Sequence, residues 1–172
     1  AGLFVLFTYI SPYLEQYSGF DSGAVTVLLF VFGVGSILGN MLGGHCADRN
    51  MNATLYIALS SLALALLALF FMGNHAWFAG PWMFVVGAAG FSIIPPLASK
   101  LIGAASSAPN LATTVNIAGF QMANAAGAWL GSVALSLGYG LGILPLLGAF
   151  LACAAICLLW ITHLYEMRRS AM

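Results

Sequence analysis

The stretch GNMLGGHCADRN, residues 39–50, follows a long apolar run and ends in an adjacent acidic and basic residue. Three glycines, Gly39, Gly43 and Gly44, precede this charged pair. Small residues at these spacings let a neighbouring helix approach closely, and a carboxylate at a helix end can pair with a cation or with the positive N-terminus of another helix. The stretch is therefore typical of a short polar turn between two tightly packed membrane helices.

The composition excludes a water-soluble globular domain. Of the 172 residues, 62% are hydrophobic and 5% are charged, and the mean hydropathy is +1.03. So few charges cannot cover a surface that faces water. The formal net charge is zero, so no basic surface indicates nucleic acid as a partner. The lipid bilayer is the expected environment.

Windows of about 20 apolar residues, the length that a helix needs to cross a bilayer, recur along the chain. They predict an all-α membrane protein with one domain over residues 1–172. The first window is short, as expected of a helix that begins upstream, and it does not resemble a signal peptide because it has no basic n-region and no cleavage site. The six predicted spans are residues 1–14, 23–45, 53–72, 81–101, 109–138 and 141–164.

The cations indicate the orientation of these spans. Arg49, Lys100, Arg168 and Arg169 all lie at or beyond the ends of even-numbered spans, and the opposite loops contain neither Lys nor Arg. Lys and Arg near span ends stay on the cytoplasmic side. Both termini are therefore predicted to be cytoplasmic.

Three stretches carry a resemblance to a known family. Gly44, followed after three residues by Asp48 and Arg49, resembles the cytoplasmic loop signature of the major facilitator superfamily, in the copy between the eighth and ninth helices. LFTYISPYLEQYSGF, residues 6–20, is similar to the seventh helix and following loop of the arabinose-efflux-permease-like and drug:proton antiporter branch. GFQMANAAGAWLGS, residues 119–132, is similar to the eleventh helix of that branch.

The resemblance implies the C-terminal half of a twelve-helix major facilitator fold, built of two inverted three-helix repeats. It implies a half of a secondary transporter of the bacterial inner membrane that exports small organic molecules, such as sugars, drugs or related metabolites. Alternating access and proton coupling would drive this export. The implied partners are a small-molecule substrate and an N-terminal six-helix half, fused upstream or separate, or a second copy of the chain.

Two other function classes were weighed against transport. A six-span scaffold or assembly protein would use the small residues for helix packing alone. An enzyme is not expected, because no nucleophile and base and no metal constellation lie at membrane depth. No cofactor is expected, and His45, Cys46 and Asp48 form only a weak metal-ligand pattern.

The resemblance further implies that the first and fourth spans line the substrate cavity. Thr8, Tyr9 and Tyr13 of the first span combine aromatic faces with hydroxyl groups, which suits amphipathic organic substrates. The alternative interpretation places the two tyrosines in the aromatic belt at the membrane surface.

The resemblance also places the second and fifth spans at the interface with the other half. Asn116, Gln121 and Asn124 of the fifth span are amides at membrane depth and need partners. They are predicted to contact substrate, and hydrogen bonding between helices is the alternative.

A set of gating residues is predicted at the presumed cytoplasmic ends of the spans. Pro95 and Pro96 remove backbone donors and are expected to bend the fourth span, which would serve gating or end the span. The charged turn is the other part of this set, because its contacts could hold one conformational state and release it. The turn contributes Gly39, Gly43, Gly44, Asp48 and Arg49.

Overall fold

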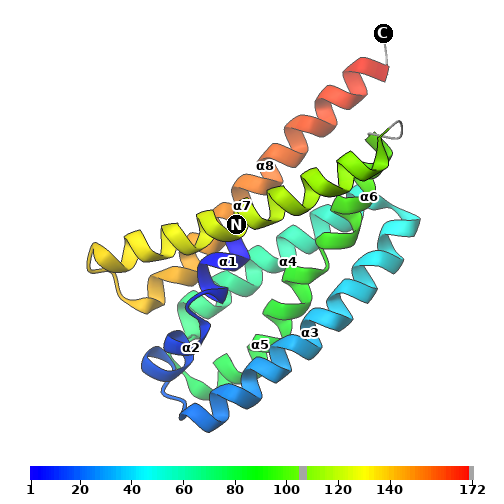
Figure 1. Cartoon of the computed structure of the whole chain (residues 1–172). Helices are drawn as coiled ribbons and strands as arrows, with labels where there is room; N and C mark the ends of the chain where they lie inside the picture. Colours follow the sequence, from blue (N-terminus) through cyan, green and yellow to red (C-terminus); the bar gives the residue numbers. More distant parts are fainter. Residues whose placement is uncertain (105–107, 171–172) are drawn as a thin grey trace.

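The computed structural model describes residues 1–104 and 108–170, in which the only secondary structure is helical (Figure 1). The predicted all-α class is therefore confirmed. Arg168 and Arg169 belong to the last helix, but their side chains lie outside the described part. In chain order the helices are α1 (Gly2–Phe7), α2 (Ile10–Pro12), the π-helix η1 (Tyr13–Tyr17), α3 (Ser22–Arg49), α4 (Met51–Met72), α5 (Ala76–Phe91), α6 (Ile94–Ala104), α7 (Pro109–Ser136), the 3₁₀-helix η2 (Leu141–Ile143) and α8 (Leu144–Ser170).

Among the described residues, four helical segments are long and apolar enough to cross a membrane: Ser22–Arg49, Met51–Met72, Ala76–Gly103 and Leu141–Tyr165. They coincide with the second, third, fourth and sixth predicted spans. The first and fifth predicted spans do not meet the same criteria. Helix α1 has only 6 residues, and α7 has 28 residues but is diluted by amides and glycines. The predicted number of six spans is thus not reached on length and hydropathy alone.

The first predicted span is a broken helix. Helix α1 ends at Phe7, and α2 begins only at Ile10. The break lies just before Pro12, which has no N–H to bond the carbonyl of Thr8, four residues earlier. The next turn is π-helical, because the Ser18 amide donates to the Tyr13 carbonyl five residues back (3.0 Å).

Residue Asn50 joins α3 to α4 and ends the run of apolar helix. Its backbone is extended, with φ −155° and ψ 98°, and its side chain accepts a hydrogen bond from the Ala53 amide (3.0 Å). This is an N-cap on α4. Helix α3 therefore continues four residues beyond the predicted end of the second span at His45. The charged pair lies in its last turn rather than in a loop.

Glycines bring α3 and α5 into backbone contact. Gly35, Gly39 and Gly43 recur every four residues on one side of α3 and are buried. A Cβ atom at these positions would overlap the carbonyl oxygens of Phe84, Ala88 and Ser92, respectively. The two helices can approach this closely only because α3 has no side chains along this line.

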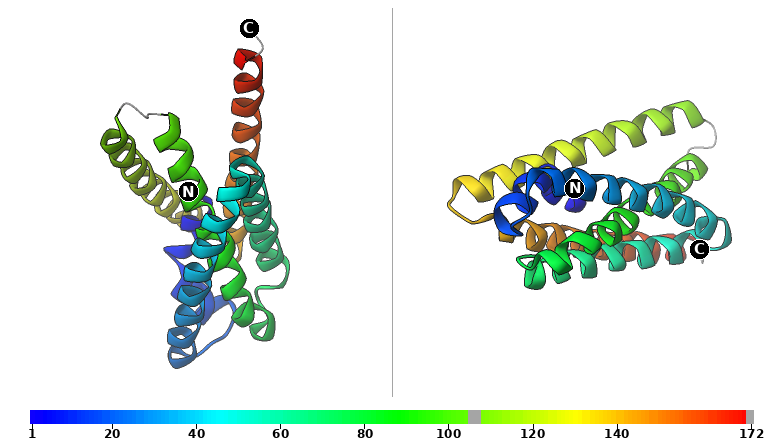
Figure 2. Two further views of the ribbon diagram at one scale, coloured as in Figure 1. Left: turned by 90° about the vertical axis from the view of Figure 1, so that its right-hand side faces the viewer. Right: turned by 90° about the horizontal axis from the view of Figure 1, so that it is seen from below.

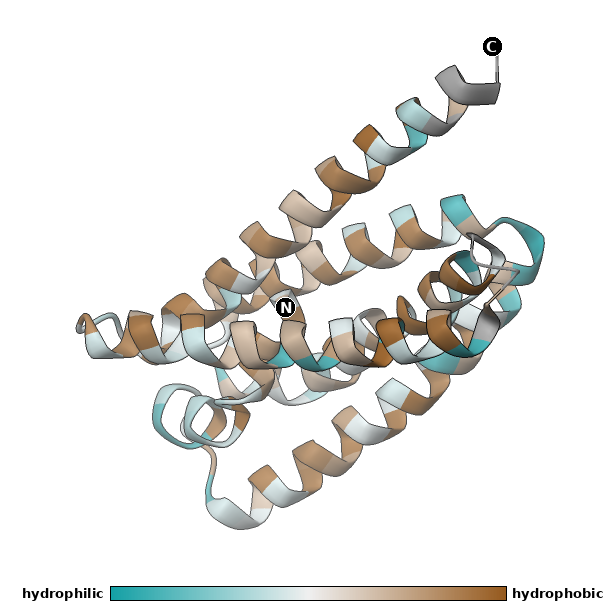
Figure 3. Cartoon of the chain, turned by 45° about the horizontal axis from the view of Figure 1, so that its top comes forward, coloured by the Kyte–Doolittle hydropathy of each residue, from teal (hydrophilic) through white to brown (hydrophobic). Residues whose placement is uncertain are grey.

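The buried core surrounds α1, which packs against both α7 and α8. Val5, Leu6, Leu66, Met83 and Leu144, from four different helices, have no exposed surface. Figure 2 shows that the C-terminal part of α8 projects beyond the other helices. Hydrophilic residues gather near the ends of the helices, whereas α7 alternates between both kinds along its length (Figure 3).

Candidate functional site

Helix α7 is fastened to the broken first helix by aromatic side chains. The rings of Phe4 and Phe120 meet edge to face, with centroids 5.0 Å apart. The Tyr9 hydroxyl donates to the carbonyl oxygen of Ala128 (3.2 Å). Gly131 makes room for the Tyr9 ring, because a Cβ there would lie 2.6 Å from Cε2 of that ring. These contacts hold one side of α7 against α1 and leave its other side uncovered.

The three predicted amides lie on α7 around this contact. Asn116 and Asn124 are half-buried, and Gln121 is exposed. Asn124 lies about two helical turns after Asn116 and nearly one turn after Gln121. The three amides therefore occupy neighbouring positions around the helix surface. Within the described part of the chain, none of the three side chains forms a hydrogen bond. Substrate contact and hydrogen bonding to a helix outside the described residues both remain open to these amides.

Aromatic rings border the amides. Phe7 on α1 is 39% exposed, and Phe120 on α7 is 37% exposed. Phe7 also contacts Phe32 of α3, with ring centroids 5.4 Å apart. The exposed sides of α1 and α7 thus offer amide donors and acceptors next to aromatic rings, a combination that suits the polar and apolar parts of one small organic molecule. We call this the α1–α7 face, defined by Phe7, Phe120, Gln121 and Asn124.

The predicted residues of the first span differ in their placement. Thr8 is exposed beside Phe7, and its hydroxyl donates to the Phe4 carbonyl (3.0 Å). Tyr9 is half-buried in the contact with α7. Tyr13 has no exposed surface, and its hydroxyl donates to the Leu69 carbonyl of α4 (3.1 Å). Thr8 and Tyr9 therefore adjoin the α1–α7 face, whereas Tyr13 has no surface to offer a ligand in this conformation.

The predicted glycines and prolines of the gating set come together from α3 and from the broken span formed by α5 and α6. Gly43 of α3 packs against the backbone of Ser92 at the break between α5 and α6, and a Cβ on Gly44 would lie 3.8 Å from Cβ of Pro95. The break itself falls at Ser92 and Ile93, just before the two prolines, as predicted. Pro96 is fully buried. Glycines of α3 therefore meet the break between α5 and α6, next to the two prolines.

Charged residues surround this meeting point. Asp48 and Arg49 are both exposed at the end of α3. Lys100 of α6 donates from Nζ to Oδ1 of Asn52 on α4 (3.2 Å). Arg49 and Lys100 thus lie at the same end of the bundle, in agreement with the predicted grouping of the cations.

Metal ligands are not gathered anywhere in the described residues, where no group of three or more His, Cys, Asp or Glu side chains could hold an ion. The three cysteines are free and exposed. The chemistry that the site offers is therefore hydrogen bonding and aromatic contact.

Reasoning from sequence missed the role of the phenylalanines. Phe4, Phe7 and Phe120 build or border the α1–α7 face, yet the chain contains 12 phenylalanines in apolar runs. Nothing in their local sequence separates these three from those that face lipid. Only the break in the first span, which turns α1 toward α7, distinguishes them.

No protein-family model matches the sequence. The chain is 39% identical over 160 residues to the inner membrane transport protein YdhP of Escherichia coli. This alignment covers 93% of the chain and 41% of YdhP. It is 32% identical over 171 residues to "Uncharacterized MFS-type transporter YtbD" of Bacillus subtilis, covering 97% of the chain and 43% of the relative.

This chain is a half-length homologue of MFS-type transporters. A further relative, named "Probable sugar efflux transporter", comes from Helicobacter pylori and is 27% identical over 156 residues, or 91% of the chain and 40% of that protein. The chain spans about two fifths of the length of these relatives. With four helices that can cross a bilayer, it is a multi-pass membrane protein.

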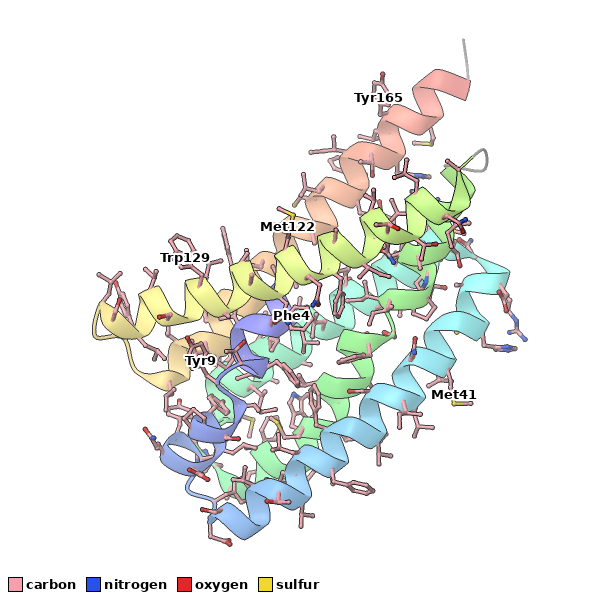
Figure 4. The ribbon with its side chains drawn as sticks, viewed as in Figure 1. Phe4, Tyr9, Met41, Met122, Trp129 and Tyr165 are labelled. Carbon is pink, nitrogen blue, oxygen red and sulfur yellow. The ribbon has the colours of Figure 1, made fainter. Side chains whose placement is uncertain are left out.

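Large apolar side chains are exposed on several helices of this MFS homologue. Met41 of α3 and Met122 and Trp129 of α7 are 67%, 74% and 65% exposed. Figure 4 shows their side chains directed away from the bundle, and that of Tyr165 likewise on the projecting part of α8. Apolar side chains in this number need lipid or protein against them.

Proposed function

We propose that this chain is the C-terminal half of a secondary transporter that exports small organic molecules by alternating access, coupled to protons. The observation that carries the proposal is the α1–α7 face. Amides cost free energy in lipid, yet they are retained there beside exposed aromatic rings and have no hydrogen-bond partner among the described residues. The relatives are named transporters, and the resemblance assigns the same helices to the cavity and to the interface between halves.

Sugars are the substrate class that we propose to test first. One group of relatives carries sugar efflux in its name. Amides beside aromatic rings suit a sugar, because the amides exchange hydrogen bonds with hydroxyl groups while a ring packs on the apolar face of the pyranose.

The proton carrier of the proposed cycle belongs to the other half. Proton-coupled transport needs a titratable group within the membrane. The four acidic residues of this chain are Glu15, Asp21, Asp48 and Glu166, and none lies in the middle of a predicted span. We therefore place the coupling carboxylate in the N-terminal six helices, which must pair with this half to complete a cavity.

The proposed location is the bacterial inner membrane, with both termini of this half in the cytoplasm. The grouping of Arg49 and Lys100 at one end of the bundle supports this orientation, because cations remain on the cytoplasmic side.

Efflux measurements on the complete polypeptide test the site. Cells that express it are loaded with radiolabelled mono- or disaccharides, and the rate of loss is compared between wild type and a Gln121→Ala, Asn124→Ala double variant. We expect efflux of at least one sugar to fall about tenfold, since two hydrogen bonds of about 0.5–1.5 kcal/mol each would be lost.

The control variant is Gln16→Ala, which removes an exposed amide in η1, far from α7 in sequence. It should leave efflux unchanged. Normal efflux of every substrate by the double variant, at equal membrane abundance, would show that the α1–α7 face does not bind substrate.

A further inference from the structure

A groove opens on the outer surface of the bundle, apart from the α1–α7 face. It lies between α3 and α4, its floor is α5, and its volume is about 330 Å³. Leu42 and Cys46 of α3 and Ile57, Ala58 and Ser61 of α4 line its two walls. The groove exists because the glycines of α3 draw that helix onto α5 and leave a furrow beside α4.

The groove suits an apolar occupant. Its rim residues Leu42 and Ile57 are 63% and 67% exposed, so it is open along its length. The Thr54 hydroxyl in its wall already donates to the Asn50 carbonyl (2.8 Å), and the Ser92 hydroxyl in its floor donates to the Ala89 carbonyl (2.8 Å). A polar ligand would lose its hydrogen bonds to water there and find few donors in return.

One end of the groove is positively charged. Arg49 follows Cys46 by three residues, so it lies on the groove side of α3, at the membrane surface.

The remaining charges near this end do not cancel that of Arg49. Asp48 lies one helical turn after Gly44, on the side of α3 that meets Pro95 rather than the groove. The charge at the mouth of the groove is therefore positive.

We propose that this groove binds an acyl chain of an anionic phospholipid from the leaflet at which α3 ends, with Arg49 at the lipid phosphate. The elongated apolar furrow fits the chain, and the cation at its end fits the headgroup. The proposal depends on the membrane location of the chain and not on its transport activity.

Photo-crosslinking tests the proposal on the complete polypeptide in phosphatidylcholine nanodiscs. The nanodiscs contain a trace of either phosphatidylglycerol or phosphatidylcholine with a diazirine in one acyl chain, and labelled peptides are mapped by mass spectrometry. We expect the phosphatidylglycerol probe to label the groove walls several-fold more than the phosphatidylcholine probe. Arg49→Gln should reduce phosphatidylglycerol labelling to the phosphatidylcholine level.

A matched pair of variants separates the groove from ordinary lipid contact. Ser61→Phe fills the groove, whereas Ser60→Phe makes the same change one residue earlier, at an exposed position outside it. We expect labelling to fall several-fold in Ser61→Phe alone. Equal labelling by the two probes in wild type, absent labelling of the groove, or the same labelling in both serine variants would overturn the proposal. Arg49→Gln changes an exposed side chain, so it keeps the charge test valid if Ser61→Phe fails to fold.

Discussion

At the scale of single residues, Tyr9 and Tyr13 make similar hydrogen bonds in different surroundings. Both Tyr9 and Tyr13 donate a hydroxyl to a backbone carbonyl of a distant helix, at 3.2 and 3.1 Å. Tyr9 does so at the edge of the α1–α7 face, but Tyr13 does so in a fully buried contact with the end of α4. A helix leaves its last carbonyls without intrahelical donors. Ser18 supplies such a donor to the Gly73 carbonyl (2.6 Å), and Tyr13 adds a second donor to the Leu69 carbonyl.

Replacing Tyr13 with Phe should therefore weaken folding slightly. We expect a loss of about 0.5–1 kcal/mol in the free energy of unfolding, because one interhelical hydrogen bond is removed. The loss stays small since the Leu69 carbonyl still accepts from the Gly73 amide (2.8 Å). Denaturant titration in detergent micelles measures it. Tyr17→Phe is the control, because that ring packs against Gly142 and its hydroxyl makes no bond within the described residues. A larger effect at Tyr17 would contradict this assignment.

At the scale of helices, the backbone contact between α3 and α5 leaves no space for a side chain at Gly39. We expect Gly39→Ala to destabilise the protein by about 2 kcal/mol, because the added methyl group would overlap the backbone of Ala88 and force the helices apart. Gly33→Ala is the matched control on the same helix, since a Cβ there meets nothing within 4 Å. It should be neutral or slightly stabilising, as alanine favours helix over glycine. Thermal unfolding of both variants in the same detergent decides between these outcomes, and equal shifts would refute the glycine contact.

Sequence reasoning predicted the elements better than their contacts. Strong apolar runs predicted the helices that match Ser22–Arg49 and Met51–Met72 within a few residues. Helix α3 continues to Arg49, past the predicted span end at His45, because a helix end exposed to water tolerates Asp48 and Arg49. The burial of Tyr13 was not foreseen, since it depends on how a proline break turns the first helix against α4. Pairwise contacts of this kind depend on the packing of distant segments, which hydropathy does not encode.

At the scale of the whole molecule, the exposed faces of α3 and α7 differ in what can cover them. Exposed apolar side chains such as Met41 and Met122 are stable against lipid, whereas the unpartnered amide of Gln121 is not. A bilayer could cover α3 alone, but α7 requires polar partners. Under the proposed function, an N-terminal half would supply these partners.

The arrangement of helices also fixes which loops share a side of the membrane. Helices α3 and α4 form one hairpin, and the chain returns through α5 and α6, so Asn74 and Gly103 lie at opposite ends of the bundle. The cations Arg49 and Lys100 accompany Gly103, which predicts that this end is cytoplasmic and that Asn74 is periplasmic. Both residues are exposed, and a Cβ at Gly103 meets nothing within 4 Å.

We replace Cys46, Cys153 and Cys157 with Ser in the complete polypeptide and introduce either Asn74→Cys or Gly103→Cys. In intact spheroplasts, an impermeant maleimide should label the Asn74→Cys variant, and it should label Gly103→Cys only after the membrane is permeabilised. The reverse pattern would invert the orientation and, with it, the leaflet in which Arg49 meets lipid, while labelling of both variants in intact spheroplasts would contradict the helix arrangement itself.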